Sequence, residues 1–243
     1  MVTLQSLLFN NFPNIIFGLA TKIDAQTDSP FGFNLSLTVG DDNQRVKLDR
    51  QRFFKSLALD NNVATQHQVH GDKILYVEKP GDQGESDAMI TDTPNLGLAI
   101  STADCASIFL YEPKRKIIAG VHSGWRGTAL NILGKTIKKL EEEFKIDPTE
   151  IIAYLGPSIT QKNYEVGEEV ARNFEDEYLL PKNGKFLLDV AKINYDILRK
   201  FEVRKENIQL SILCSFEWNA LFHSYRRDGE LSGRMLGVLT MKG

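Results

Sequence analysis

Three side chains of the 243-residue chain are candidates for metal chemistry: His70, Cys105 and His122. Each lies at or beside the end of a run of apolar residues of the kind that forms a buried strand. Because strand ends open into a shared rim, side chains that are distant in sequence can converge there. Two imidazoles and one thiolate suit zinc, and three protein ligands leave a fourth position for water or substrate, which is typical of catalytic sites. A single thiolate leaves the site with residual positive charge, which favours ionisation of a bound water.

The same residues also allow other interpretations, because their spacing matches no short metal motif. A histidine in a strand is more often a satisfied core residue than a ligand, and a lone buried cysteine usually behaves as a small hydrophobe. Cys105 and His122 could instead form the nucleophile–base pair of a cysteine hydrolase. Asp87 and Asp104 could orient a ligand histidine from behind, although Asp104 could equally cap a turn. Cys214 follows an apolar run and is expected in the core.

Two basic segments are candidates for anion binding. The segment from His122 to Gly127 joins an apparent strand to an apparent helix, so its backbone N–H groups would point outward and Arg126 could clamp a phosphate or carboxylate. Within the segment from Ser224 to Gly229, Arg227 is the second candidate. The structural alternatives are a helix start with a surface arginine and a solvated turn, respectively. Trp125 could stack on a base, but core packing is its more common use.

The pattern of apolar residues predicts an α+β fold with mixed β-sheets flanked by helices, in a single domain over residues 1–243. Strands outnumber helices, and the segments do not alternate as regular βαβ units. Helices are expected at Asn43–Leu59, Thr128–Phe144, Gly167–Phe174 and Asp189–Phe201. Strands are expected at Leu96–Ser101, Ala106–Tyr111, Ile117–Val121, Ile151–Leu155, Ile208–Leu213 and Met235–Met241, with a hairpin over Val63–Val77 that turns at Gly71-Asp72.

Composition is that of an ordinary globular domain. The apolar fraction is 42%, the charged fraction is 25% and the formal net charge is −3, so neither nucleic acid nor a membrane surface is expected as a partner. The first residues lack the features of a signal peptide, and no apolar run approaches the ~18 residues of a membrane span. With only two cysteines, these features predict a cytoplasmic protein without a disulfide framework.

At this point the motifs resemble those of a known family. Five of them occur in order: Gln68–Gly71 (QVHG), Ser86–Ala88 (SDA), Thr102–Cys105 (TADC), Gly120–Gly127 (GVHSGWRG) and Ser224–Gly229 (SYRRDG). The chain resembles the family once called multicopper polyphenol oxidases or laccase-domain proteins, and now described as purine nucleoside phosphorylases and peptidoglycan editing factors. The resemblance extends from Asn34 to Met235. One departure is visible, since Thr38 stands where the family pattern leads us to expect histidine, and this affects expectations about substrate choice.

The resemblance implies a zinc site formed by His70, Cys105 and His122, with copper as the alternative metal. It also implies phosphorolysis of adenosine, inosine and S-methyl-5′-thioadenosine, with some adenosine deamination, and a fold related to bacterial toxin cysteine hydrolases. In this scheme Arg126, the backbone after His122 and Arg227 would hold phosphate. The expected partners are small-molecule nucleosides and phosphate, and the protein would be a monomer or a weak homo-oligomer.

Three other functions remain open on the sequence. The first is a cysteine amidase or editing hydrolase on peptidoglycan precursors, with Cys105 as nucleophile and His122 as base. The second is a copper-dependent polyphenol oxidase, because His₂Cys is also the ligand set of a type-1 copper site, although a reducing cytoplasm and an open fourth position favour zinc. Multicopper oxidation would need about ten histidines by the usual reckoning, and the chain has 4. The third is a non-enzymatic partner protein stabilised by zinc.

Overall fold

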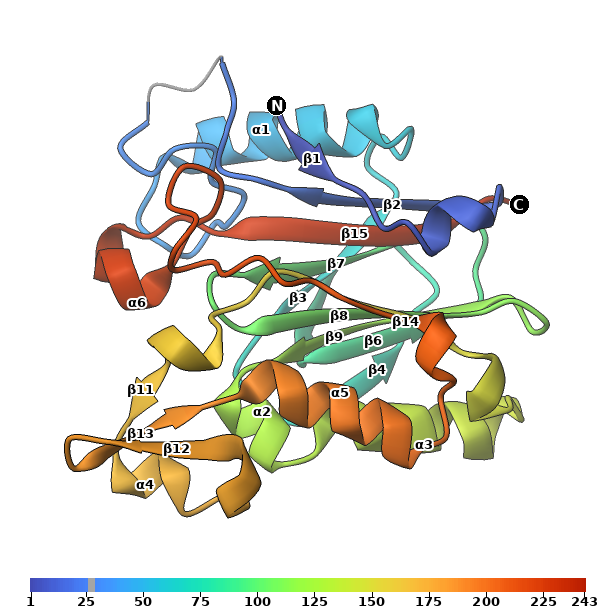
Figure 1. Cartoon of the computed structure of the whole chain (residues 1–243). Coiled ribbons are helices and arrows are strands. Elements are labelled where there is room, and N and C mark those ends of the chain that lie inside the picture. The colour runs from blue at the N-terminus through green and yellow to red at the C-terminus, as the bar shows by residue number, and fades with distance from the viewer. Residues whose placement is uncertain (26–28) are drawn as a thin grey trace.

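The structure is a computed structural model that describes residues 1–25 and 29–243, and these residues form four layers (Figure 1). Helix α1 (Asn43–Ser56) covers the outer face of a first six-stranded sheet, which packs on a second six-stranded sheet. Helices α3 (Ile132–Phe144) and α5 (Val190–Lys200) cover the outer face of the second sheet. This arrangement confirms the predicted α+β class with mixed sheets. The expected kinship with toxin cysteine hydrolases stays a prediction.

The first sheet has the strand order β1-β2-β15-β7-β3-β5 and contains both parallel and antiparallel pairs. Its strands are β1 (Thr3–Leu4), β2 (Ile15–Ala20), β15 (Met235–Met241), β7 (Gly97–Thr102), β3 (Val63–His67) and β5 (Gly81–Glu85). The second sheet has the order β14-β10-β8-β9-β6-β4. Its strands are β14 (Ile208–Leu210), β10 (Ile152–Leu155), β8 (Ala106–Glu112), β9 (Ile117–Ser123), β6 (Ala88–Thr91) and β4 (Ile74–Tyr76).

A small third sheet lies beside this body and has the order β11-β13-β12. Its strands are β11 (Glu165–Val166), β13 (Lys185–Leu188) and β12 (Leu179–Lys182). Three further helices are short: α2 (Trp125–Ala129), α4 (Glu168–Ala171) and α6 (Tyr225–Asp228). In Figure 1 the three-stranded sheet and α6 lie on the same side of the molecule, so segments far apart in sequence share one rim.

Alternation along β9 sorts its side chains between two cores. Ile117, Ala119 and Val121 belong to the core beneath α3 and α5. Ile118 belongs to the core between the two sheets. Because side chains i, i+2 and i+4 of a strand share a face, His122 lies on the same face as Ile118, at the end of the inter-sheet core. The hydrophobic packing of β9 thereby fixes the direction in which this histidine points.

The predicted hairpin over Val63–Val77 is wrong, because its two strands belong to different sheets. Strand β3 pairs in parallel with β5 and β7 in the first sheet, whereas β4 pairs in parallel with β6 in the second. The chain between them crosses from one sheet to the other. Its turn at Gly71-Asp72 is therefore part of a crossover rather than of a tight hairpin, and the Asp72 carboxylate pairs with Lys135 on α3.

The predicted helix over Thr128–Phe144 is in fact two helices. Helix α2 ends at Ala129, and Asn131 has a φ of 57°, which lies outside the helical region and interrupts the backbone before α3 begins. The helix expected at Gly167–Phe174 is shortened to α4. The helix expected at Asp189–Phe201 is observed as α5, and the Asp189 side chain accepts a hydrogen bond from the backbone N–H of Lys192 as its N-cap.

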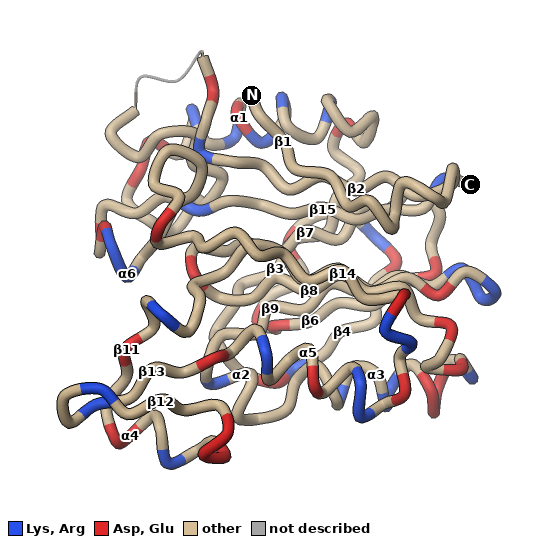
Figure 2. Tube along the Cα trace, in the orientation of Figure 1, with Lys and Arg blue, Asp and Glu red and all other residues tan. Residues whose placement is uncertain are grey.

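Charged side chains of both signs are interspersed along the helices and loops (Figure 2). Among the residues described, no helix combines the length and the apolar character needed to cross a membrane.

Candidate metal centre

The structure brings His70, Cys105 and His122 together, as the sequence predicts. Their ligand atoms all lie within 4.8 Å of one another. The Sγ atom of Cys105 is 3.9 Å from Nε2 of His70, and the two imidazole rings meet edge to face with centroids 4.9 Å apart. Ideal tetrahedral zinc bonds of 2.0–2.3 Å would place these donor atoms about 3.5 Å apart. The observed separations are wider than this, but the three side chains lie close enough together that they could hold a metal ion.

The three candidate ligands come from two connections and one strand end. His70 lies on the crossover between β3 and β4, Cys105 on the turn between β7 and β8, and His122 at the end of β9. His70 has a φ of 62°, and Asp104, immediately before Cys105, has a φ of 88°. Such values are uncommon for residues with a side chain and cluster at functional sites, where the surrounding structure enforces them.

Asp87 is fully buried, and its hydrogen bonds hold both the backbone of His70 and the side chain of His122 in place. Its carboxylate accepts hydrogen bonds from the backbone N–H groups of Val69, His70 and Gly71 at 2.7–3.2 Å. It also accepts one from Nδ1 of His122 at 2.8 Å. Burial raises the pKa of Asp87, but these hydrogen bonds outweigh burial and hold it below its ordinary value.

The hydrogen bond to Asp87 determines which nitrogen of His122 is available. With Nδ1 donating to the carboxylate, Nε2 is left to face Cys105 and His70 as a ligand atom. This is the orienting role expected of Asp87 from the sequence.

Cys105 and His122 form a strongly interacting pair. Burial raises the pKa of the Cys105 thiol, but the charge of His122 and hydrogen bonds from His122 and His70 outweigh burial and lower it. Burial lowers the pKa of His122, but the thiolate and Asp87 outweigh burial and raise it. The site therefore favours a thiolate at Cys105, which is the form that binds metals and attacks electrophiles.

Gly124 is required by the packing of the ligands. A Cβ atom at this position would lie 2.8 Å from Sγ of Cys105 and 3.1 Å from Cδ2 of His70. Only glycine lets the backbone after His122 approach both side chains this closely. His70 is exposed, Cys105 is partly exposed and His122 is buried, so the site opens to solvent on the side of His70.

The two arginines predicted to bind anions have different environments. Arg126 is exposed, and its guanidinium stacks over the ring of Trp125, with Cζ 4.5 Å from the ring centroid. Trp125 also packs against the core beneath α3 and α5, which is the alternative that the sequence left open.

The guanidinium of Arg227, in contrast, is held by hydrogen bonds within the protein. Its Nη1 donates to the carbonyls of Ser215 and Phe216, its Nη2 to the carbonyl of Phe222, and Nε and Nη2 to the carboxylate of Asp228. These bonds occupy all five guanidinium N–H groups, so Arg227 has no donor left for phosphate. The expectation that it helps to hold phosphate is therefore not supported by its geometry.

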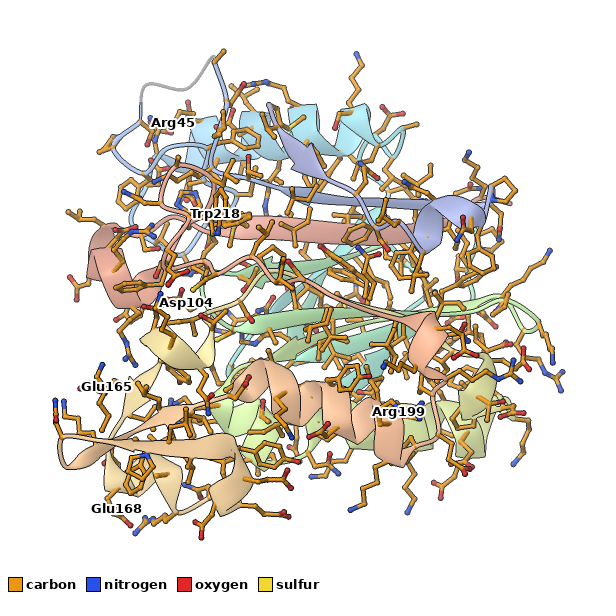
Figure 3. All side chains as sticks on the ribbon, in the orientation of Figure 1. Arg45, Asp104, Glu165, Glu168, Arg199 and Trp218 are labelled. Atoms are coloured by element: carbon orange, nitrogen blue, oxygen red, sulfur yellow. The ribbon has the colours of Figure 1, made fainter. Side chains whose placement is uncertain are left out.

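Asp104 acts differently from Asp87. Its carboxylate accepts hydrogen bonds from the hydroxyls of Ser215 (2.6 Å) and Ser224 (3.0 Å) and from the backbone N–H of Arg226 (2.7 Å). It therefore fixes the segment before α6 rather than a ligand histidine, which agrees with the turn-capping alternative. Figure 3 shows Asp104 above Glu165, on the side of the molecule where α6 faces β11.

Tyr164 lies next to β11 on this rim, and no sequence pattern marks it as a functional residue. The guanidinium of Arg226 lies over its ring, with Cζ 5.0 Å from the centroid. Cys214 is buried, as expected, and its Sγ accepts hydrogen bonds from the backbone of Thr160 and the side chain of Asn163. Thr38 shares a hydrogen bond with Ser36, whose hydroxyl also accepts one from the backbone N–H of Thr38.

The chain and its fold match those of a recognised family. The model of the family described as multi-copper polyphenol oxidoreductase laccase matches residues 17–242, and the chain belongs to this family. A purine nucleoside phosphorylase from Deinococcus radiodurans is 36% identical over 90% of this chain and 86% of that protein. Purine nucleoside phosphorylase CA_C1699 from Clostridium acetobutylicum is 33% identical, over 88% of this chain and 89% of that protein.

A solved structure agrees with the sequence relatives. The crystal structure of YlmD from Geobacillus stearothermophilus superimposes with a TM-score of 0.91 at 29% identity, covering 98% of this chain and 94% of that one. The resemblance seen in the five motifs is thereby confirmed over nearly the whole chain.

Proposed function

We propose that this protein is a zinc-dependent purine nucleoside phosphorylase that converts adenosine, inosine and S-methyl-5′-thioadenosine to the free base and the (methylthio)ribose 1-phosphate. We also propose a side activity as an adenosine deaminase. The observation that carries the proposal is the convergence of His70, Cys105 and His122 within 4.8 Å, with Asp87 orienting His122. The names of the relatives support the reaction class. The partners would be nucleosides and phosphate, and the location would be cytoplasmic.

In this reaction a phosphate oxygen forms a bond to C1′ of the ribose. The C1′–N9 bond breaks, its electron pair leaves with the purine, and the departing base takes up a proton. Arg126 would bind the phosphate dianion through its exposed guanidinium and orient it towards the sugar. Asp87 would keep His122 in one tautomer throughout. A zinc ion held by the three ligands would supply a Lewis acid to polarise a purine atom or a water beside it, and the same property would serve deamination.

The donor set argues against the multicopper chemistry in the family's description. Beyond His70 and His122, the chain contains only His67 and His223. The ring of His223 is buried and its Nε2 donates to the carbonyl of Phe33. The only group of three or more candidate ligands among the described residues is the one described here. Two histidines and one cysteine supply ligands for a single ion, so multicopper oxidation lacks its ligands.

The decisive test is to identify products. Metal-analysed protein is incubated with adenosine or inosine, with and without phosphate, and the products are separated by chromatography. We expect free purine and ribose 1-phosphate only when phosphate is present, and loss of both after a chelator removes the metal. A small amount of inosine from adenosine would report the deaminase activity. Zinc-loaded protein that releases no base from any of the three nucleosides would contradict the proposal.

A cysteine amidase is the second candidate, and one observation favours it. Cys105 contacts His122, and His122 contacts Asp87. The three are thus placed as the nucleophile, the base and the carboxylate that orients the base, which is the arrangement that cysteine hydrolases use. This arrangement also supports the proposed kinship with toxin cysteine hydrolases. His70 separates the two candidates, because its Nε2 lies 3.9 Å from the sulfur of Cys105. A metal site needs this third ligand, whereas a nucleophile–base pair does not.

A further inference from the structure

Tyr164 lies where the small third sheet meets the rim of the metal site. Its ring lies beneath the guanidinium of Arg226, and Nη1 of Arg226 donates to the backbone carbonyl of Glu165 at 2.6 Å. Arg226 therefore holds both the side chain of Tyr164 and the backbone that follows it. Figure 3 labels Glu165 on this side of the three-stranded sheet.

Arg226 is in turn tied to the metal ligands through Asp104. The backbone N–H of Arg226 donates to the Asp104 carboxylate at 2.7 Å, and Asp104 immediately precedes Cys105. Asp104 is buried, with 8% of its surface exposed, so this bond is largely protected from water. The connection Cys105–Asp104–Arg226–Tyr164 thus runs from the proposed metal to the third sheet through one peptide bond, one hydrogen bond and one stacking contact.

Tyr164 is surrounded by charges of both signs. Burial raises its pKa, the charges of Cys105 and Asp104 raise it further, and those of Arg226 and Arg126 lower it. Tyr164 therefore lies within electrostatic reach of both arginines and of the thiolate. Among the described residues its hydroxyl has no hydrogen-bond partner. Arg226 has used one of its five guanidinium N–H groups, in contrast to Arg227.

We propose that Tyr164 and Arg226 form, together with Arg126, the subsite that binds the phosphate co-substrate. The inference rests on the proposed phosphorylase function and moves the second phosphate ligand from Arg227 to Arg226. The two guanidiniums supply positive charge and N–H donors to the phosphate oxygens, and the phenol of Tyr164 donates a further hydrogen bond. Tyr164 and Arg226 are linked to Cys105 through Asp104, and Arg126 follows His122 by four residues, so a phosphate held among them would face a nucleoside bound at the metal.

This subsite also explains why the third sheet packs where it does. Among the described residues, strand β11 and the turn before it contribute no member of the candidate ligand group, yet they bring a tyrosine beneath Arg226 of α6. Arg226 on α6 and Arg126 on α2 come from segments about 100 residues apart in sequence. A phosphate held by both guanidiniums would therefore bridge these two segments.

The test uses the full-length zinc-loaded protein and inorganic phosphate as the probe. Tyr164→Phe removes the hydroxyl but keeps the ring beneath Arg226, and Arg226→Gln removes the charge. Tyr178→Phe, in the same sheet region beneath Lys192, and Arg115→Gln, at the opposite end of β8 and β9, are the matched controls. Phosphate affinity is measured without turnover by calorimetry or ³¹P line broadening, and the phosphate KM and the nucleoside KM are measured with turnover.

We expect both test variants to weaken phosphate binding about tenfold or more, the usual effect of losing a hydrogen bond or charge on an anion, while zinc content and nucleoside KM stay near wild type. The controls should bind phosphate as wild type does. Unchanged phosphate affinity in Tyr164→Phe and Arg226→Gln would overturn the inference. A wild-type protein that binds phosphate through these residues but releases no purine would instead overturn the phosphorylase function and leave the subsite standing.

Discussion

At the scale of single residues, the chemistry depends on how Cys105 is used. The charge of His122 and hydrogen bonds from both histidines lower the pKa of its thiol, and they outweigh the opposing effect of burial. A thiolate in this position can bind a metal or attack an electrophile. Gly124 allows His70 to come close to it, since any side chain there would collide with both. The presence of this second histidine is the reason to prefer a ligand role.

The alkylation rate of Cys105 separates the two roles. As a zinc ligand the sulfur should react slowly with iodoacetamide until a chelator removes the metal, because coordination occupies the lone pair that attacks. The rate is followed by peptide mass mapping, with buried Cys214 as the internal control for unfolding. We expect a rate increase of at least tenfold on chelation. Rapid labelling of fully zinc-loaded protein would favour the amidase.

Residue types predicted the centre of the site better than its rim. His70, Cys105 and His122 could be found because two imidazoles and a thiolate beside strand ends point to few kinds of chemistry. Arg227 was a poor candidate because its sequence context does not show that neighbouring carbonyls and Asp228 use its donors. Tyr164 could not be found, since it adjoins a strand of only two residues and its position depends on the contact with Arg226.

At the scale of elements, the crossover between β3 and β4 is the part that shapes the site. It passes from one sheet to the other, and three of its backbone N–H groups converge on the carboxylate of Asp87, just before β6. The same carboxylate orients His122 from β9. One buried acid therefore sets the relative position of two candidate ligands from different elements.

Asp87→Asn tests this coupling. An amide in place of the carboxylate removes a charge, and its NH₂ group would face some of the N–H groups that now donate to Asp87. His122 then loses the acceptor that sets its preferred tautomer. We expect zinc affinity to fall about 10–100-fold, as is usual when such a partner is lost, measured by competition with a chromophoric chelator. Asp92→Asn, at the other end of β6, is the control, because Asp92 is exposed and accepts a bond from Tyr76. Equal zinc affinity in both variants would contradict the coupling.

Element prediction succeeded where apolar periodicity was strong and failed where the chain changes direction. Strand β15 is found as predicted, and α1 begins at the predicted residue, Asn43. The hairpin prediction was wrong because the pairing partners of a strand are set by the whole sheet, and β3 pairs with β5 and β7 rather than with β4. The long helix failed at Asn131, whose left-handed conformation is a tertiary feature that helical periodicity does not reveal.

At the scale of the whole molecule, the candidate ligands lie along the seam between the two large sheets. His70 and Cys105 are on connections that leave the first sheet for the second, and His122 is on a strand of the second. A metal ion bound here would add a further link between segments that already meet through the inter-sheet core, the pairing of β8 with β9 and the hydrogen bonds of Asp87. Metal binding should therefore contribute to the stability of the complete fold as well as to chemistry.

Thermal unfolding with and without zinc measures this contribution. At zinc concentrations about 100-fold above the Kd, binding to the native state alone contributes about 2.7 kcal/mol. For a chain of this length that corresponds to a rise in Tm of roughly 5–10 °C. His122→Ala should lose the rise, and His67→Ala should keep it because His67 is exposed at the end of β3. An equal rise in both variants would place the stabilising metal elsewhere.

The order of strands in the first sheet has a consequence for biosynthesis. Its second and fourth strands, β2 and β7, are both bonded to β15, which comes last in the chain. At ordinary translation speeds, roughly ten to forty seconds separate β2 from β15 on the ribosome. During that interval both neighbours of the missing strand have unpaired edges. The nascent protein should therefore bind holding chaperones until β15 emerges, although the residues of the metal site have all been made long before.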